Sequence, residues 1–139
     1  MKFSNVFLGY ILVILVGIFS ATAMADESAS GEIINKCGAT PPMPSIPNGM
    51  KASMDDMLAA QKKIKAFQAE AQKYRACVGQ FIDQWGKQAK DPDADDDAKS
   101  AAGEKASIAT NFYNQSVSDE EDVANMFNTA IHAFNGKKK

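Results

Sequence analysis

The stretch that decides the fold runs from residue 53 to residue 90 and reads SMDDMLAAQKKIKAFQAEAQKYRACVGQFIDQWGKQAK. Apolar residues recur along it in alternating steps of three and four: Met57, Ala60, Ile64, Phe67, Ala71, Tyr74, Val78, Phe81 and Trp85. This spacing places them on one face of a helix over about four heptads, which is long enough to favour a coiled-coil-like pairing. Lysine and glutamine fill the intervening positions and give the helix a solvated outer face.

A second helix is expected over residues 98–135. Its apolar stripe is broader and closer to a 3.6-residue period: Ala102, Ala109, Phe112/Tyr113, Ser116/Val117, Val123/Ala124, Phe127, Ala130/Ile131 and Phe134. Ser118 opens a capping-box pattern, so a break or kink there is an alternative to a continuous helix. The two helices are nearly equal in length and closely connected, so the sequence predicts an all-α fold, a long antiparallel two-helix hairpin, followed by a basic tail at 137–139.

An acidic loop, residues 91–97, is expected between the two helices. Its alternating acids imitate the opening of a calcium-binding EF-hand loop: Asp91, Asp93 and Asp95. Asp96 stands where such a loop needs glycine, and Ala102 stands where it needs a bidentate glutamate. Acids placed before a helix also interact favourably with its N-terminal dipole, and this structural interpretation is preferred here.

The first 25 residues have the layout of a secretory signal peptide. Lys2 precedes an apolar run at residues 6–19, near the upper end of the ~7–15 residues of such a segment. Ala23-Met24-Ala25 fits the small-x-small cleavage rule, with Ala21-Thr22-Ala23 as a competing site. We therefore expect cleavage near Ala25 and a periplasmic or secreted chain. An uncleaved leader acting as a membrane anchor is the alternative.

Residues 26–52 are expected to form a disordered start followed by an extended arm. The start, DESASGE, is small and polar. Prolines then recur at Pro41, Pro42, Pro44 and Pro47, and each fixes φ and favours an extended preceding residue. Pro47-Asn48-Gly49 is typical of a turn, because Asn and Gly tolerate backbone angles that other residues avoid. The turn delivers the chain to the first helix.

The two cysteines, Cys37 and Cys77, are expected to form a disulfide in an exported chain. The length of the arm is sufficient for this pairing. The helix rises about 36 Å from Ser53 to Cys77, and an extended arm from Ser53 back to Cys37 covers about 50 Å. The arm can therefore fold back along the helix. A redox-active or metal-binding thiol pair is the alternative, but the spacing is not Cys-x-x-Cys and no histidine is near in sequence.

Few residues indicate metal binding, catalysis or phosphate binding. Met50, Met54 and Met57 cluster in the sequence and could bind Cu(I), although methionine at helical spacing is more often core. His132 is the single histidine, no nucleophile elbow is present, and no glycine-rich phosphate loop occurs. We therefore expect no enzyme and no cofactor. A net charge of −2 lacks the basic face of a nucleic-acid-binding protein.

The layout resembles a set of small exported proteobacterial proteins. The resemblance rests on Cys37 with Pro41-Pro42-x-Pro44-x-x-Pro47-Asn48-Gly49, on Ala59-Ala60-Gln61-x-x-Ile64-Lys65-x-Phe67, on Tyr74-x-x-Cys77, and on Tyr113-Asn114 and Phe127-Asn128. It covers most of the chain after the leader. It implies the helical architecture, and no activity or functional residue comes with it.

The sequence therefore favours a non-enzymatic interaction or envelope-associated structural module. Its partner would be another protein or a second copy, since a lone two-helix hairpin buries little surface. Contact with a membrane would come only through an uncleaved leader. A metal-binding protein, using the methionines for Cu(I) or the loop acids for Ca²⁺, is the alternative.

Overall fold

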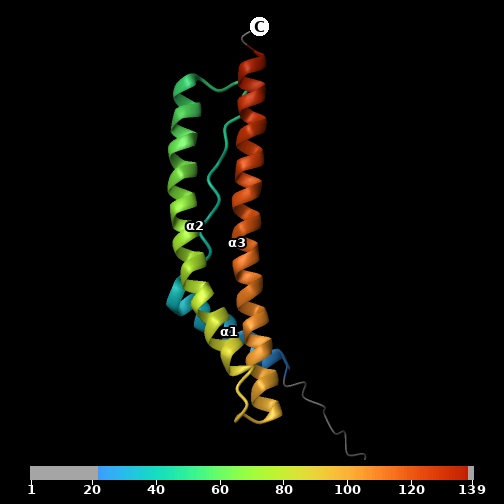
Figure 1. Ribbon diagram of the computed structural model, residues 1–139. Coiled ribbons are helices and arrows are strands. Elements are labelled where there is room, and N and C mark those ends of the chain that lie inside the picture. Colours follow the sequence, from blue (N-terminus) through green and yellow to red (C-terminus); the bar gives the residue numbers. More distant parts are fainter. Residues whose placement is uncertain (1–21, 138–139) are drawn as a thin grey trace, which may run out of the picture.

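The computed structural model describes residues 22–137, and within them the chain forms three α-helices (Figure 1): α1 (Thr22–Cys37), α2 (Met54–Gln88) and α3 (Asp96–Gly136). Helices α2 and α3 lie side by side and run in opposite directions, and α1 packs near the end where the loop joins them. The expectation of an all-α chain is confirmed. The expectation of only two helices was wrong, because α1 precedes the arm.

The core lies between α2 and α3. The buried residues of α2 are the ones that its three-four spacing predicted, from Met57 to Trp85. Opposite them, α3 buries Ala102, Ala109, Ser116, Val123, Ala130 and Phe134. Most of these residues belong to three apolar clusters that follow one another along the length of the pair. Burial along the seam holds the two long helices together, and α1 and the following arm pack against the pair.

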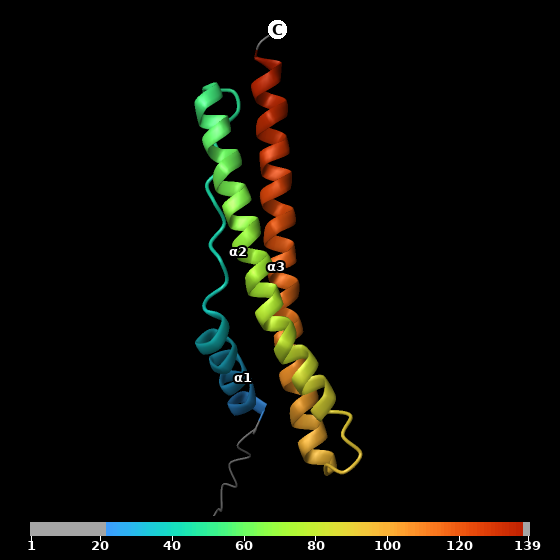
Figure 2. The same ribbon diagram turned by 60° about the vertical axis from the view of Figure 1, so that its left-hand side comes forward.

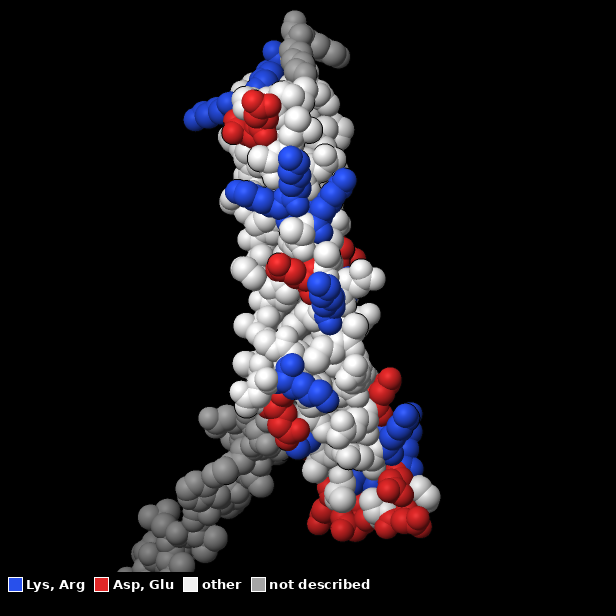
Figure 3. All heavy atoms as spheres, turned by 90° about the vertical axis from the view of Figure 1, so that its left-hand side faces the viewer, with Lys and Arg blue, Asp and Glu red and all other residues white. Residues whose placement is uncertain are grey.

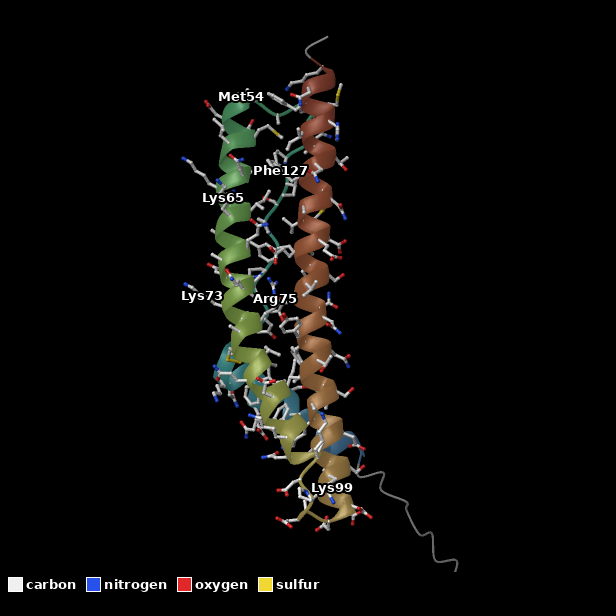
Figure 4. All side chains as sticks on the ribbon, in the orientation of Figure 1. Met54, Lys65, Lys73, Arg75, Lys99 and Phe127 are labelled. Carbon is white, nitrogen blue, oxygen red and sulfur yellow. A yellow bond between two sulfur atoms is a disulfide. The ribbon has the colours of Figure 1, made fainter. Side chains whose placement is uncertain are left out.

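Helix α3 is continuous through Ser118, so the alternative of a break there was wrong. The acids that resembled a capping box serve other contacts. Asp119 accepts a hydrogen bond from the Gln115 side chain at 2.7 Å, and Glu120 pairs with Arg75 of α2 at 2.7 Å. Arg75 also donates to the hydroxyl of buried Ser116 at 3.3 Å. These contacts leave no reason for the helix to end (Figure 4).

The disordered start was also wrong, because residues 26–37 belong to α1. Ala29 and Ile33 are fully buried and pack in one cluster with Tyr74, Val78, Phe81 and Trp85. On the outer side, Lys105 of α3 pairs with Glu32 at 2.9 Å and lies 5.4 Å from the centre of the Trp85 ring. Gly38, with φ +80°, ends the helix and donates its N–H to the Ile34 carbonyl.

The arm between α1 and α2 runs extended along the helix pair, beside both α2 and α3 (Figure 2). Near its start, the Thr40 hydroxyl donates to Tyr74 Oη at 3.3 Å. Near its end, Ile46 packs against two of the core clusters. A disulfide joins Cys37 to Cys77, with the two Cα atoms 5.7 Å apart. The prediction that the arm folds back to reach Cys77 is confirmed.

The helix ends differ slightly from the expected bounds. Asp95 caps α3 by accepting a hydrogen bond from the Ala98 N–H at 2.7 Å, so α3 begins two residues earlier than predicted. Residues 1–21 of the expected signal peptide (residues 1–25) and the last two lysines of the tail lie outside the described residues, so the signal peptide stays a prediction. Within residues 22–137, no helix has both the length and the apolar character needed to cross a membrane.

Candidate functional site

The most distinctive local structure is the turn that connects the arm to α2. The N–H groups of Lys51 and Ala52 both donate to the Asn48 carbonyl, at 3.0 and 2.9 Å. The Asn48 side chain accepts a further hydrogen bond from the Met50 N–H at 3.0 Å. Asparagine favours such turns because its side chain bonds to the backbone two residues on. The turn therefore has a fixed shape, and we call residues 46–50 the arm turn.

Gly49 seats the arm turn directly on the backbone of α3. A Cβ atom at this position would lie 2.0 Å from the Ala130 carbonyl oxygen and 2.8 Å from the Phe134 nitrogen. Both are backbone atoms of a helix and cannot move aside easily. Only glycine permits an approach this close. The contact joins two segments far apart in sequence and fixes where the arm turn stands on α3.

A capping box follows the arm turn and starts α2. The Ser53 N–H and hydroxyl both donate to Asp56 Oδ2, at 2.8 and 2.7 Å, and the Ser53 hydroxyl accepts from the Asp56 N–H at 3.1 Å. The backbone hydrogen bond from Ser53 lowers the pKa of Asp56 below its usual 3.8, and the side-chain hydrogen bond and nearby Lys137 act in the same direction.

Lys137 closes the same end of the molecule from the other side. Its ammonium group donates to the Ala52 carbonyl and lies 4.3 Å from the centre of the Phe134 ring. Placed just after α3, this cation also lies where the carbonyl end of the helix dipole is negative. The last turn of α3, the arm turn and the start of α2 are therefore joined at one place.

A groove of about 600 Å³ lies between the arm turn and α3. Its apolar lining comes from both sides: Ile46, Pro47, Met50, Met126, Ala130 and Ala133. Asn48, Asn125 and Thr129 add uncharged polar groups. Met50 is 60% exposed and Met126 is 43% exposed, so two large apolar side chains stand in solvent along one groove. We call this feature the arm-turn groove.

The α3 wall of the arm-turn groove carries no formal charge. Residues 123–136 include no Asp, Glu, Lys or Arg, and much of this stretch is exposed on the outer face of α3. Depletion of charged residues together with enrichment of methionine is typical of the central part of protein–protein interfaces. Sequence reasoning missed the groove, although the charge-free run and the Asn48-Gly49 pair were both visible.

The structure places the three methionines proposed for Cu(I) in different surroundings. Met57 is 7% exposed and packs in the core with Ala52, Ala130 and Phe134. Met50 lines the arm-turn groove, whereas Met54 is 51% exposed in the first turn of α2 (Figure 4). The side chain of Met57 is therefore used in packing, which is the usual role of methionine at helical spacing.

Two of the three acids proposed for Ca²⁺ accept hydrogen bonds from backbone N–H groups. Asp91 accepts from the Asp93 N–H at 3.0 Å, and Asp95 caps α3. Among the side chains that the structure describes, residues 29–137, no group of three or more His, Cys, Asp or Glu is arranged to hold a metal ion. The loop acids gather at the far end of the rod in Figure 3, while lysine and arginine side chains are spread along the α2 face.

Two other hollows differ from the arm-turn groove in their surroundings. One, of about 650 Å³, lies beside the end of α2 and is bordered by charged residues such as Asp83, Lys87 and Asp91. Another, of about 320 Å³, lies beside the disulfide between Lys36, Glu70 and Lys73. Charged side chains at the border of a hollow are well solvated, so covering them with a partner is unfavourable unless they are paired. The arm-turn groove is therefore the better binding surface.

Comparison with known proteins gives no match: no protein-family model, curated protein or solved structure is significantly similar to this chain.

Proposed function

We propose that this protein is an exported, non-enzymatic structural module of the cell envelope that binds another protein chain through the arm-turn groove. The observation that carries the proposal is the pair of exposed methionines, Met50 and Met126, facing one apolar groove on a charge-free helix surface. Contiguous exposed apolar surface marks interaction sites, and flexible methionines adapt to the side chains of a partner.

The polar groups around the groove support a binding role over a catalytic one. Asn48 is engaged by the backbone of the arm turn, and Ser53 and Asp56 are engaged with each other. Lys137 bonds to the Ala52 carbonyl. Each group thus holds the turn in shape. A rigid, pre-shaped apolar surface loses little conformational entropy when a partner binds.

Two features support export. The disulfide is of the kind that persists in oxidising compartments. In addition, Ala29, Ile33 and Cys37 of α1 all follow Ala25, so cleavage there would retain the part of α1 that packs against α2 and α3. N-terminal sequencing of the protein recovered from the envelope tests this step. Asp26 is the expected first residue, and an intact Met1 would show that the leader is retained.

Photo-crosslinking in intact cells tests the binding surface. A photoreactive amino acid at Met126 should give discrete crosslinked products. The same substitution at Met54, which is equally large and similarly exposed but lies outside the groove, serves as the matched control. Products of defined mass at Met126 and none at Met54 support the proposal. Equal crosslinking at both positions, or none at either, contradicts it.

A further inference from the structure

The face of α3 that borders the arm-turn groove continues beyond it as a regular stripe. Asp119, Asp122, Met126, Thr129 and Ala133 follow one another in steps of three and four, and Lys137 lies four residues further on. Residues at this spacing share one face of a helix. The stripe therefore begins with two acids, passes through Met126 and small residues at the groove, and ends with a cation.

The charges along this stripe would match those of a second stripe that runs in the opposite direction, because the acids of each would face the cation of the other. We propose that the partner at the arm-turn groove is a second copy of this chain, paired antiparallel along the α3 stripe about a two-fold axis between Thr129 and Ala130. The inference rests on the proposed function and names its partner. In this register Met126 faces the partner's Ala133, and Asp122 faces the partner's Lys137.

Shape supports this register. A methionine beside small residues can act as a knob that enters a facing hole, because Thr129 and Ala133 let two helices approach closely. The hole is the arm-turn groove itself, which has room for a side chain between Met50 and Ala133. Two-fold symmetry makes the insertion reciprocal, so each copy supplies one knob and one hole.

Charge supports the same register. Asp119 and Asp122 lie at one end of the stripe and Lys137 lies at the other; two more lysines follow Lys137 in the sequence. Antiparallel pairing brings opposite signs together at both ends, whereas parallel pairing would bring like charges together. Lys137 already bonds to the Ala52 carbonyl, but an ammonium group has three donors and can also pair with a carboxylate.

The proposed dimer has a distinctive length. Helix α3 alone spans about 60 Å at 1.5 Å per residue. The two-fold axis lies about 50 Å from the start of α3, so the dimer extends about 100 Å from end to end. A parallel pair, or a pair overlapping over the whole helix, would be only slightly longer than one copy. Overall length therefore distinguishes the proposed register from other dimers.

Sedimentation velocity over a range of concentrations, followed by small-angle X-ray scattering, tests the inference on the oxidised protein purified from cells that express the full chain. We expect a reversible dimer with a maximum dimension of about 100 Å. Met126→Asp should weaken dimerisation at least about tenfold, while Met54→Asp should leave it unchanged. A dimer of about 65 Å, or equal effects of the two substitutions, overturns the register.

Charge reversal tests the ends of the stripe. Asp122→Lys should weaken the dimer several-fold, and the loss should shrink as salt screens the repulsion. Asp83→Lys, an equally exposed acid on α2, is the matched control and should have no effect. A protein that stays monomeric at every concentration refutes the inference. If Met126 then crosslinks to a different protein, the proposed function stands; if it crosslinks to nothing, both fail.

Discussion

The disulfide end and the arm-turn end of the molecule both hold the arm against α2 and α3, but they do so by different means. At the disulfide end, α1 covers Tyr74, Phe81 and Trp85, a covalent bond holds its last turn, and Lys105 adds an ion pair on the outside. At the arm-turn end, Gly49 seats the turn on bare helix backbone and Lys137 bonds across the end. Met50 and Met126 remain exposed there.

This difference indicates a division of roles along the rod. The disulfide end buries Tyr74, Phe81 and Trp85 beneath α1 and leaves Ile34 on the outer side of that helix. The arm-turn end buries Met57 with Phe134 and adds the backbone contact of Gly49, while Met50 and Met126 stay exposed. We therefore propose that the disulfide end chiefly stabilises the fold and that the arm-turn end binds the partner. Substitutions made separately at the two ends should therefore have different effects.

The largest expected effect is loss of the disulfide. Replacing both cysteines, Cys37→Ser with Cys77→Ser, frees a loop whose ends are 40 residues apart, and the chain-entropy relation gives a destabilisation of about 4 kcal/mol. Denaturant unfolding measures the change. Hydrogen exchange should show that amides of α1 lose protection first, since the covalent bond holds that helix at its last turn.

The arm-turn end supplies the internal control for that experiment. Amides of Lys51 and Ala52 donate to Asn48 within the turn and should keep their protection in the double variant. Equal loss of protection at both ends would show that the molecule opens as one unit, and the division of roles would then be wrong.

The next largest effect is expected at Gly49. Gly49→Ala places a methyl group against the Ala130 carbonyl, so the turn must lift away from α3. Overpacking against atoms that cannot move costs about 1–3 kcal/mol, and backbone contact favours the upper part of that range. Thermal unfolding measures the loss. Crosslinking through Met126 should also fall, because the groove loses one wall.

Gly79→Ala is the matched control. Nothing lies within 4 Å of a Cβ at Gly79, which is inside α2. The same substitution there should stabilise the protein by about 0.5–1 kcal/mol, because alanine is the better helix former. Destabilisation of similar size at both glycines would mean that the close approach of the arm turn to α3 is not what Gly49 provides.

Sequence reasoning succeeded where a pattern is local. Each apolar residue of the α2 seam is buried because its neighbours three and four positions away define one face, and that rule needs no knowledge of the partner helix. The disulfide was predictable because extended-chain reach and helix rise can be compared directly. Helix α1 was missed because its composition is polar. Among the side chains of α1 that the structure describes, Ala29, Ile33 and Cys37, spaced by four, mark its buried face.

The arm-turn groove could not be predicted in the same way. Its two walls come from segments far apart in sequence, and their separation depends on the contact between Gly49 and the backbone at Ala130. The sequence shows a turn and, elsewhere, a charge-free helix. It does not show that the turn lies on that helix. A tertiary contact between backbone atoms leaves no periodic signal.

The smallest effect is expected at the start of α2, where the dependence of stability on pH tests the contribution of the arm-turn end. Hydrogen bonds from Ser53 hold the pKa of Asp56 below 3.8 in the folded protein. The folded state therefore binds the proton less readily than the unfolded state. The carboxylate stabilises the fold above pH 3.8, and this contribution disappears as the pH falls through the lowered pKa. Asp56→Asn should thus lower the melting temperature at about pH 7 and have almost no effect at about pH 2.

Asp55→Asn, in the same first turn, controls for the general effect of an acid at a helix N-terminus. If both substitutions lower the melting temperature equally and with the same pH dependence, the effect comes from the helix dipole and not from the Ser53 hydrogen bonds. The hydrogen-exchange protection of α1 should not change in either variant, because Asp56 acts at the other end of the rod.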